Sequence, residues 1–521
     1  MFENCPQYLP SSCPSIREAL RRLARPWAAF PAALALVHGL LLSPSSHAAE
    51  LEASDGAAGD QFGRSVSLSG TSGLIGAPND DDKGNDSGSA YIYRNLDAAS
   101  GTINQQVKLT ASDGAGGDLF GFSVSLSGTS GLVGAYGDDD NASSSGSAYL
   151  FRDLHVAGPT KTQDVKLTAS DGAAGDSFGQ TVYLSGTSAL VGSIRYQSSQ
   201  GSAYLFRDLH EAGPTKTEDV KLTASDGAAN DFFGNSLSLS GTSGLVGAPN
   251  DDDKGNNSGS AYLFRNLHAG GPTKTEDAKL NASDGAASDS FGHSVSLSGT
   301  SGLVGAPGDD DKGSGSGSAY LFRNLHVAGL TKTEDVKLNA SDGAASDSFG
   351  HSVSLSGTSA LVGAHRDDDK GNNSGSAYLF RNLHAAGSTK TQDVKLTASG
   401  GAANDFFGES VSLDGDNFLI AAYTGDGNFA DSGKAYSGSV SSMTTLDTGA
   451  ASRSISGLSF VSQVDWIIGE STSGNAVTLE AGDSATVTAA DKAVQCTSGK
   501  MQAPATTASP STAHSPPMPF T

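Results

Sequence analysis

A Phe-Gly pair recurs seven times along the chain, and successive pairs lie 58 residues apart except for one interval of 55. Internal repetition at a period above about 40 residues, with β-type patterning, is typical of a propeller or a solenoid. The repeat therefore limits the chain to an array of similar units. The seven phenylalanines are Phe62, Phe120, Phe178, Phe233, Phe291, Phe349 and Phe407.

Each repeat is predicted to hold four β-strands. In the first copy, Phe62, Arg64, Val66 and Leu68 alternate with small polar residues, and this period of two indicates a strand rather than a helix. Gly, Ser, Thr, Asn and Asp fill the segments between strands, which is the chemistry of turns. In the fourth copy the predicted strands are 220–224, 233–240, 244–248 and 260–265.

Seven units of four strands predict an all-β fold, a seven-bladed β-propeller of four-stranded blades. An open β-solenoid is the alternative, but its units usually run to about 20–30 residues. Residues 51–54 match the strand that opens each repeat, and residues 434–437 match the strand that ends it. Pairing of these segments would close the ring with an N-terminal strand and leave neither sheet edge bare. Glycines in the second strand, from Gly76 to Gly363, would let neighbouring strands or blades approach closely.

The repeat resembles a known family. Phe291-Gly292, followed by Gly305-Ala306-Pro307, is similar to the FG-GAP repeat of the integrin α-subunit headpiece, and the likeness covers about residues 50–437. The resemblance implies a seven-bladed propeller, extracellular placement, calcium-binding loops, and adhesion or ligand binding. The calcium loops of that family lie between FG and GAP. Here only the seventh repeat has carboxylates in that segment, Asp414 and Asp416.

Aspartates gather instead in the loop after each GAP-like segment. Carboxylate oxygens with Gly and Asn nearby suit Ca²⁺, which takes 6–8 oxygen ligands. The alternative is a set of solvated turns in which the first aspartate makes an Asx turn. The third repeat has residues 194–197 in this place and cannot do the same. The candidate calcium ligands are Asp80, Asp81, Asp82, Asp138, Asp139, Asp140, Asp251, Asp252, Asp253, Asp309, Asp310, Asp311, Asp367, Asp368, Asp369, Asp426 and Asp431.

A second set of aspartates precedes the Phe-Gly pairs by two residues, and these are predicted to accept backbone N–H groups at a turn. Because antiparallel strands alternate in direction, both sets of loops should emerge on one face of the disc. That face should carry most of the acid excess of a chain with net charge -24. The second set is Asp60, Asp118, Asp176, Asp231, Asp289, Asp347 and Asp405.

The termini differ from the repeats. Arginines and then an apolar run from Trp27 to Leu42 predict a signal peptide over 1–48, cleaved near Ala48. A membrane anchor is the alternative, but the run is shorter than the roughly 20 residues that a span needs. No later stretch is apolar enough to span a bilayer as a helix. The propeller is assigned to 50–437, a small β-rich linker segment to 438–495, and a disordered Pro/Ser/Thr/Ala-rich tail to 496–521.

Catalytic motifs are missing from the sequence, and almost every polar residue is copied around the ring. Equivalent histidines are therefore expected at separate, exposed positions; one asymmetric histidine or carboxylate cluster in the central channel would instead favour an enzyme. These histidines are His155, His210, His268, His326 and His384 in one loop, and His293 and His351 after Phe-Gly.

The sequence predicts a non-enzymatic, secreted or cell-surface binding and adhesion propeller. It is expected to be a monomer, assisted by Ca²⁺, with an extracellular protein or glycan ligand bound through its loop faces. An acidic chain of pI about 4.6 would repel nucleic-acid phosphates. Two alternatives stay open: a secreted, glycan-active hydrolase that uses a carboxylate pair, and a structural surface spacer.

Overall fold

A computed structural model describes most of the repeat region and part of the C-terminal region. Residues 47–440 form one compact unit, and the C-terminal strands belong to another. The predicted signal peptide, 1–48, lies outside the described residues. The described residues are 49–97, 103–327, 329, 331–385 and 387–440, together with the backbone of the strands between 454 and 502.

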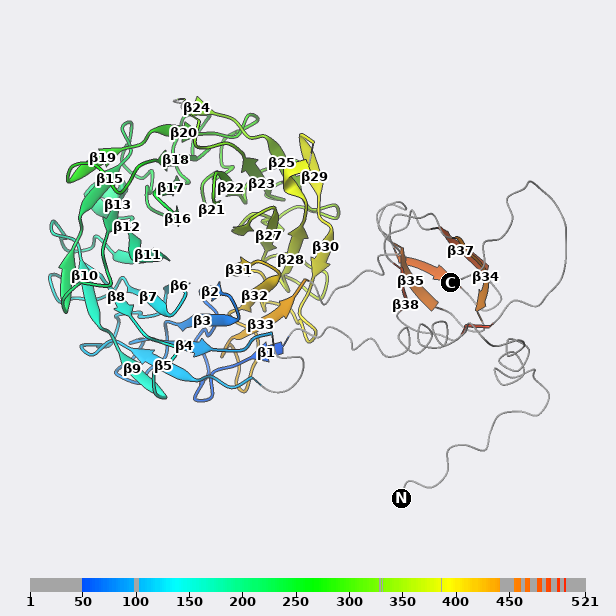
Figure 1. The fold of residues 1–521 in the computed structure, drawn as a ribbon, viewed down its shortest axis with the longest axis horizontal. Helices are drawn as coiled ribbons and strands as arrows, with labels where there is room; N and C mark the ends of the chain where they lie inside the picture. The colour runs from blue at the N-terminus through cyan, green and yellow to red at the C-terminus, as the bar shows by residue number, and fades with distance from the viewer. Residues whose placement is uncertain are drawn as a thin grey trace, which may run out of the picture. The chain divides into compact units, whose positions relative to one another are not determined.

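Seven sheets, each with four antiparallel strands, are arranged around a central axis, which confirms the seven-bladed propeller (Figure 1). In order from the axis outward, the strands of each blade are called inner, second, third and outer. They are β2 (Val66–Ser69), β3 (Ser72–Ala77), β4 (Ser89–Tyr93) and β5 (Val107–Thr110); β6 (Ser123–Ser127), β7 (Ser130–Ala135), β8 (Ser147–Phe151) and β10 (Val165–Thr168); β11 (Phe178–Ser185), β12 (Ser188–Ser193), β13 (Ser202–Phe206) and β15 (Val220–Thr223); β16 (Ser236–Ser240), β17 (Ser243–Ala248), β18 (Ser260–Phe264) and β20 (Ala278–Leu280); β21 (Ser294–Ser298), β22 (Ser301–Ala306), β23 (Ser318–Phe322) and β25 (Val336–Asn339); β26 (Ser352–Ser356), β27 (Ser359–Ala364), β28 (Ser376–Phe380) and β30 (Val394–Leu396); β31 (Val411–Asp414), β32 (Asn417–Ala422), β33 (Lys434–Ser439) and β1 (Ala49–Leu51).

The N-terminal strand closes the ring as predicted. β1 pairs antiparallel with β33, with Ala49 opposite Ser437 and Leu51 opposite Ala435. The strand lies at residues 49–51, slightly before the predicted segment 51–54. Every other blade takes its outer strand from the start of the next repeat, so sequence repeats and blades are offset by one strand. This offset ties each blade covalently and by hydrogen bonds to its neighbour.

Five blades contain a fifth strand that the four-strand prediction missed. Each fifth strand comes from the loop of the following blade and pairs in parallel with the outer strand, as in β5 with β9, where Lys108 lies opposite Thr160. An outer strand leaves a row of backbone donors and acceptors at a sheet edge, and the added strand covers it. The fifth strands are β9 (Thr160–Thr162), β14 (Thr215–Thr217), β19 (Thr273–Thr275), β24 (Thr331–Lys332) and β29 (Thr389–Thr391).

The hydrophobic core lies between consecutive blades. One cluster joins Ile92 and Leu109 of blade 1 to Phe120, Val133 and Tyr149 of blade 2, all of them buried. The phenylalanine of the Phe-Gly pair anchors this layer, since the ring of Phe120 lies 5.6 Å from that of Tyr149 in its own blade. Burial of such side chains at each blade interface supplies the main drive for closing the ring.

The glycines of the repeat let adjacent blades touch through their backbones, as the sequence predicted. A Cβ on Gly76, in the second strand of blade 1, would overlap the carbonyl oxygen of Gly121, the Phe-Gly glycine of blade 2. Gly305 stands in the same relation to Gly350. The FG and GAP glycines are therefore the two sides of one close contact between blades.

Serines connect the inner strands around the axis. The hydroxyls of Ser65 and Ser67 accept hydrogen bonds from the backbone N–H groups of Val124 and Leu126 in the next blade, at 3.0 and 2.9 Å. The same pattern links blade 7 to blade 1, where Val66 N–H donates to Ser410 at 3.0 Å. Inner-strand edges are thus satisfied by side chains of the neighbouring blade, which keeps the sevenfold ring regular.

Strands also form in the C-terminal region. The C-terminal strands, predicted over 454–460, 466–468 and 476–479, are present as β34, β35 and β36, and three-stranded sheets β37-β34-β39 and β36-β35-β38 form. Among the described residues, no helix is long and apolar enough to cross a membrane. The C-terminal strands are β34 (Ser454–Phe460), β35 (Val464–Ile468), β36 (Ala476–Leu479), β37 (Ser484–Thr488), β38 (Val494–Cys496) and β39 (Met501–Gln502), and the short helices are α3 (Tyr196–Ser199) and η1 (Leu383–Ala385). β39 falls in the tail predicted to be disordered, and residues 503–521 of that tail lie outside the described residues.

Candidate functional site

The aspartate loops meet on one face, as predicted, and a lysine joins them. In blade 1, the Nζ atom of Lys108 on the outer strand lies 2.7 Å from Asp55, 3.1 Å from Asp80 and 2.5 Å from Asp82. Asp55 belongs to the loop before the inner strand, and the other two belong to the loop after the second strand. We call three aspartates around one outer-strand lysine an Asp trio.

Five blades contain an Asp trio. In four of them, one carboxylate oxygen from each aspartate lies within 4.8 Å of the others, so by distance the trios could hold a metal ion. The trios are Asp55, Asp80 and Asp82 around Lys108; Asp113, Asp138 and Asp140 around Lys166; Asp226, Asp251 and Asp253 around Lys279; Asp284, Asp309 and Asp311 around Lys337; and Asp342, Asp367 and Asp369 around Lys395.

The three consecutive aspartates of each loop have different roles. Asp80 is buried, and it accepts hydrogen bonds from Tyr91 at 2.8 Å and from the backbone N–H of Asp82 at 3.1 Å. The second bond is the Asx turn of the solvated-turn alternative. Asp81 instead accepts the N–H of Asp86 at 2.8 Å, and exposed Asp82 turns toward Lys108. Within the run, Asp80 and Asp82 thus face the lysine, and Asp81 holds the loop.

The lysine stabilises the charge of its trio. Burial alone would lower the pKa of Lys337, but its three carboxylate partners raise it above its usual range. Burial would likewise raise the pKa of Asp309, yet the hydrogen bond from Tyr320 and the charge of Lys337 hold it below its usual range. An ammonium thus stands where a calcium ion would need to sit. The trios offer three carboxylates each and fit Ca²⁺ only if that lysine moves away.

Blades 3 and 7 differ from the others, as their loop sequences predicted. Lys221 of blade 3 pairs with Asp171, and its Nζ atom lies 3.4 Å from the centre of the Tyr196 ring, which takes the place of the missing aspartates. In blade 7, Asp426 accepts the N–H of Asp431 at 3.0 Å.

The aspartate before each Phe-Gly pair is structural, as predicted. Asp60 accepts the backbone N–H of Ala57 at 2.6 Å, and the bond recurs in all seven blades. Burial, together with nearby carboxylates, raises the pKa of Asp289 to about 6 and that of Asp347 to about 6.

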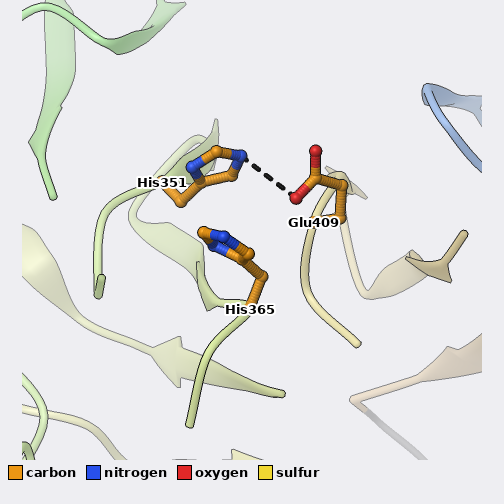
Figure 2. Close-up of side chains that lie close together, drawn as sticks. All are labelled: His351, His365 and Glu409. Atoms are coloured by element: carbon orange, nitrogen blue, oxygen red, sulfur yellow. Dashed lines mark ion pairs between the residues drawn. The ribbon is translucent and has the colours of Figure 1, made fainter. Parts of the chain in front are cut away.

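A second cluster lies at the axis and occurs only once among the residues that the structure describes. The inner strands begin at the axis, directly after each Phe-Gly pair. At this position Glu409 of blade 7 lies 2.6 Å from Nη1 of Arg64 in blade 1 and 3.2 Å from Nε2 of His351 in blade 6. The ring of His351 lies 3.9 Å from that of His365 and 4.7 Å from that of His293 (Figure 2 shows the first pair with Glu409). We call these five residues the axial cluster.

Aromatic side chains surround the axial cluster. The Arg64 guanidinium lies 4.6 Å from the centre of the Phe122 ring and 5.6 Å from that of Tyr423. Phe406 lies 5.7 Å from His365 and stacks on Tyr423 at 5.8 Å. One guanidinium therefore lies between two aromatic rings, within a row of rings that runs from blade 6 through blade 7 to blade 2.

The cluster holds neutral imidazoles beside an ionised carboxylate. Burial and the neighbouring His351 lower the pKa of His293 to about 3 and that of His365 to about 3. Burial alone would raise the pKa of Glu409, but His351 and Arg64 hold it well below its usual range. At neutral pH the cluster thus contains the carboxylate of Glu409, the guanidinium of Arg64 and the neutral imidazoles of His293 and His365.

The prediction for His293 and His351 was wrong. Equivalent residues are far apart on outer loops, and the five loop histidines are indeed exposed. On inner strands, however, equivalent residues converge at the axis. Six outer-strand lysines on the acidic face were also missed, because each stands between apolar residues in a strand. The alternation of the outer strand, with Lys108 between Val107 and Leu109, was the signal that could have placed them.

Comparison with known protein families gives a match over most of the repeat region. The model of the FG-GAP repeat family matches seven segments that together cover more than half of the chain, and this confirms the resemblance found in the sequence. No curated protein sequence matches the chain significantly. The matched segments are 46–93, 103–151, 162–206, 217–264, 275–322, 333–380 and 391–437.

Proposed function

The chain belongs to the FG-GAP repeat family, and from that premise we propose that it is a non-enzymatic binding propeller whose axial cluster and surrounding aromatic rings hold an extracellular ligand. The export-type N-terminus, Arg-rich and then apolar before Ala48, supports a secreted or cell-surface location. A ring closed by its own N-terminal strand leaves no blade to be completed by a second chain, which supports a monomer.

The proposal is carried by the contrast in repetition on the acidic face. The Asp trios are copied in five blades, but the position after Phe-Gly holds a different residue in almost every blade. A single ligand needs a surface that is not sevenfold, because its own groups are not arranged with that symmetry. The seven residues at this position are Arg64, Phe122, Gln180, Asn235, His293, His351 and Glu409.

The chemistry of the axial region favours a glycan over a protein. Phe122, Tyr136 and Tyr423 are partly exposed, and Phe122 and Tyr136 stack edge to face at 4.7 Å. Flat aromatic faces pack against the C–H faces of sugar rings, and Arg64 and Glu409 supply hydrogen-bonding groups beside them. A protein ligand is the second outcome that the binding test distinguishes.

Calcium has a limited role in this proposal. In each Asp trio one lysine offsets one of the three negative charges and stands between the carboxylates, so Ca²⁺ would screen the charge that is left on exposed aspartates such as Asp81 and Asp82, without being a core ligand of the fold. Ligand binding at the axis would then depend only weakly on Ca²⁺.

A glycan array and a cell-binding assay test the proposal. We expect the full chain to bind a restricted set of glycans, and Phe122→Ala and Glu409→Gln to reduce that binding by about tenfold or more, as for central residues of an interface. Val327→Ala is the matched control, since Val327 is an exposed apolar residue, 59% accessible, on the loop that follows a third strand. Binding that survives both axial variants, or no binding at all, would contradict the proposal; the latter result would favour the structural spacer.

The hydrolase alternative gains one observation, since the axial cluster is the asymmetric histidine and carboxylate group that an enzyme would need. A glycosidase of the usual kind uses a pair of carboxyl groups, one of them protonated. Glu409 is the one carboxylate within the axial cluster, and its lowered pKa makes it a poor proton donor. Release of reducing sugar from a bound glycan would revive this alternative.

A further inference from the structure

Three residues of the axial cluster bring together atoms that can bind a metal ion. One ligand atom from each of His351, His365 and Glu409 lies within 4.8 Å of the other two. The residues come from three places on two blades: the start of the inner strand of blade 6, the end of its second strand, and the start of the inner strand of blade 7. Figure 2 shows the two imidazole rings side by side and the carboxylate facing them.

His365 has a buried ring nitrogen that makes no hydrogen bond. The side chain is buried, with the residue only 6% exposed, and its Nδ1 atom has no hydrogen-bond partner. A buried polar atom without a partner loses its hydration without compensation. Such an atom beside a second imidazole and a carboxylate is suited to bind a ligand.

The surroundings also suit a metal ion with nitrogen ligands. Arg64 holds Oε1 of Glu409 and leaves Oε2 directed to His351. The ring of Phe406 packs next to His365, and Tyr423 stacks on Phe406. Outer hydrogen bonds that orient a carboxylate, and an apolar shell, are recurrent features around protein metal sites.

We propose that His351, His365 and Glu409 bind one divalent transition-metal ion of the Zn²⁺ class. Two imidazoles and one carboxylate are a ligand set that suits Zn²⁺, Ni²⁺ or Cu²⁺ and is too poor in oxygen for Ca²⁺. The three protein ligands leave a coordination position open to water or to a ligand oxygen. This inference does not depend on the proposed glycan binding, because it concerns the unliganded protein.

Titration of the full chain, purified without a histidine tag, tests the site. We expect isothermal titration with Zn²⁺ to give one specific site per chain. Co²⁺ should give a visible d–d absorption that Zn²⁺ abolishes and that excess Ca²⁺ leaves unchanged. His351→Gln, His365→Gln and Glu409→Gln should each weaken binding by at least about tenfold, the smallest loss expected when even an outer partner of a metal site is removed.

His268→Gln is the control, because His268 lies exposed on an outer loop, and it should bind Zn²⁺ like the unmodified chain. Thermal melting of every variant shows whether it is folded, and three independent variants ensure that one failure to fold leaves the test intact. Absence of a Co²⁺ spectrum in the unmodified chain, or a spectrum that persists in all three folded variants, would overturn the proposal.

Discussion

The acidic face stabilises its carboxylates differently at the rim, where the Asp trios lie, and at the axis, where Glu409 lies. At the rim, Asp284, Asp309 and Asp311 are held by one lysine, and the arrangement is copied from blade to blade. At the axis, the single carboxylate of Glu409 lies between an arginine and a histidine from different blades, and the arrangement occurs once.

This difference indicates that the rim has a structural role and that the axis is the better candidate for ligand recognition. At the rim, lysines and backbone N–H groups hold the aspartates of the loops, so many of these aspartates make internal contacts. The axis leaves His365 Nδ1 unpartnered and aromatic rings partly exposed. Among the described residues, the numerous carboxylates are therefore poorer candidates for function than the few residues that break the repeat.

The largest expected effect is the loss of stability when one Asp trio loses its lysine. Lys337→Met leaves three carboxylates without their cation and should lower the free energy of unfolding by about 3 kcal/mol, the low end for breaking a buried ion pair, because two of the three are partly exposed. Chemical denaturation measures it. Lys332→Met is the control: its pair with Asp335 is on the surface at 3.1 Å and should be worth less than about 1 kcal/mol. Equal losses in both variants would refute the structural role of the trio.

The next effect tests the repeated blade contact. Gly305→Ala places a Cβ onto the carbonyl oxygen of Gly350 and should destabilise the propeller by about 1–3 kcal/mol, as overpacking does. Gly271→Ala, where no atom lies within 4 Å, should change stability by less than about 0.5 kcal/mol. The melting temperatures of the two variants test this prediction. An unchanged melting temperature in Gly305→Ala would show that the blades can move apart there without a loss of stability.

A smaller effect follows from the rim aspartates with raised pKa. Asp289 and Asp347 titrate near pH 6 in the folded chain and near 3.8 when unfolded, so their contribution to stability is present at low pH and is lost as pH rises through 6. The melting temperature should therefore rise by about 1–3 °C when the pH is lowered from 7 to 5. Below about pH 4 it should fall, because Asp309, Asp367 and Glu409 have lowered pKa values.

The variant Asp289→Asn with Asp347→Asn gives the control for this pH effect. The amide oxygen still accepts the turn N–H but does not titrate. The rise between pH 7 and pH 5 should shrink in the double variant, and a rise of unchanged size would assign the effect to other groups.

The smallest effect is that of calcium on the unmodified chain. Because lysines occupy the trios, millimolar Ca²⁺ should shift melting by less than about 1 °C relative to chelator. Lys337→Met frees one trio and should respond more strongly than the unmodified chain. A large shift in the unmodified chain, equal to that of the variant, would show that Ca²⁺ displaces the lysines.

The sequence was sufficient to predict the ring because each signal was local and repeated. Phe-Gly spacing, strand alternation and the match between residues 51–54 and 434–437 all depend on the chain's own periodicity, and closure by β1 followed from them. The fifth strands were not predictable in this way, since Thr-Lys-Thr segments are too short and polar to stand out as strands before the sheet edge that they cover is known.

The site was harder to predict for a geometric reason. The sequence placed Asp80 and Asp82 in one loop, but it did not show the lysine that reaches them from a strand 28 residues away from Asp80. His351 and Glu409 meet across a blade boundary, and their proximity depends on the radius at which inner strands pack. Sequence spacing predicts equivalence between blades, but it does not show whether equivalent residues lie near the axis or far from it.

Anomalous diffraction from crystals of the full chain grown with Zn²⁺ and Ca²⁺ tests the central claim most directly, namely that lysines fill the repeated rim and that the axis is left to bind. The account predicts one Zn²⁺ peak between His351, His365 and Glu409, with Lys108, Lys279 and Lys337 still among their aspartates. Metal peaks within the Asp trios and displaced lysines, with no metal at the axis, would contradict it.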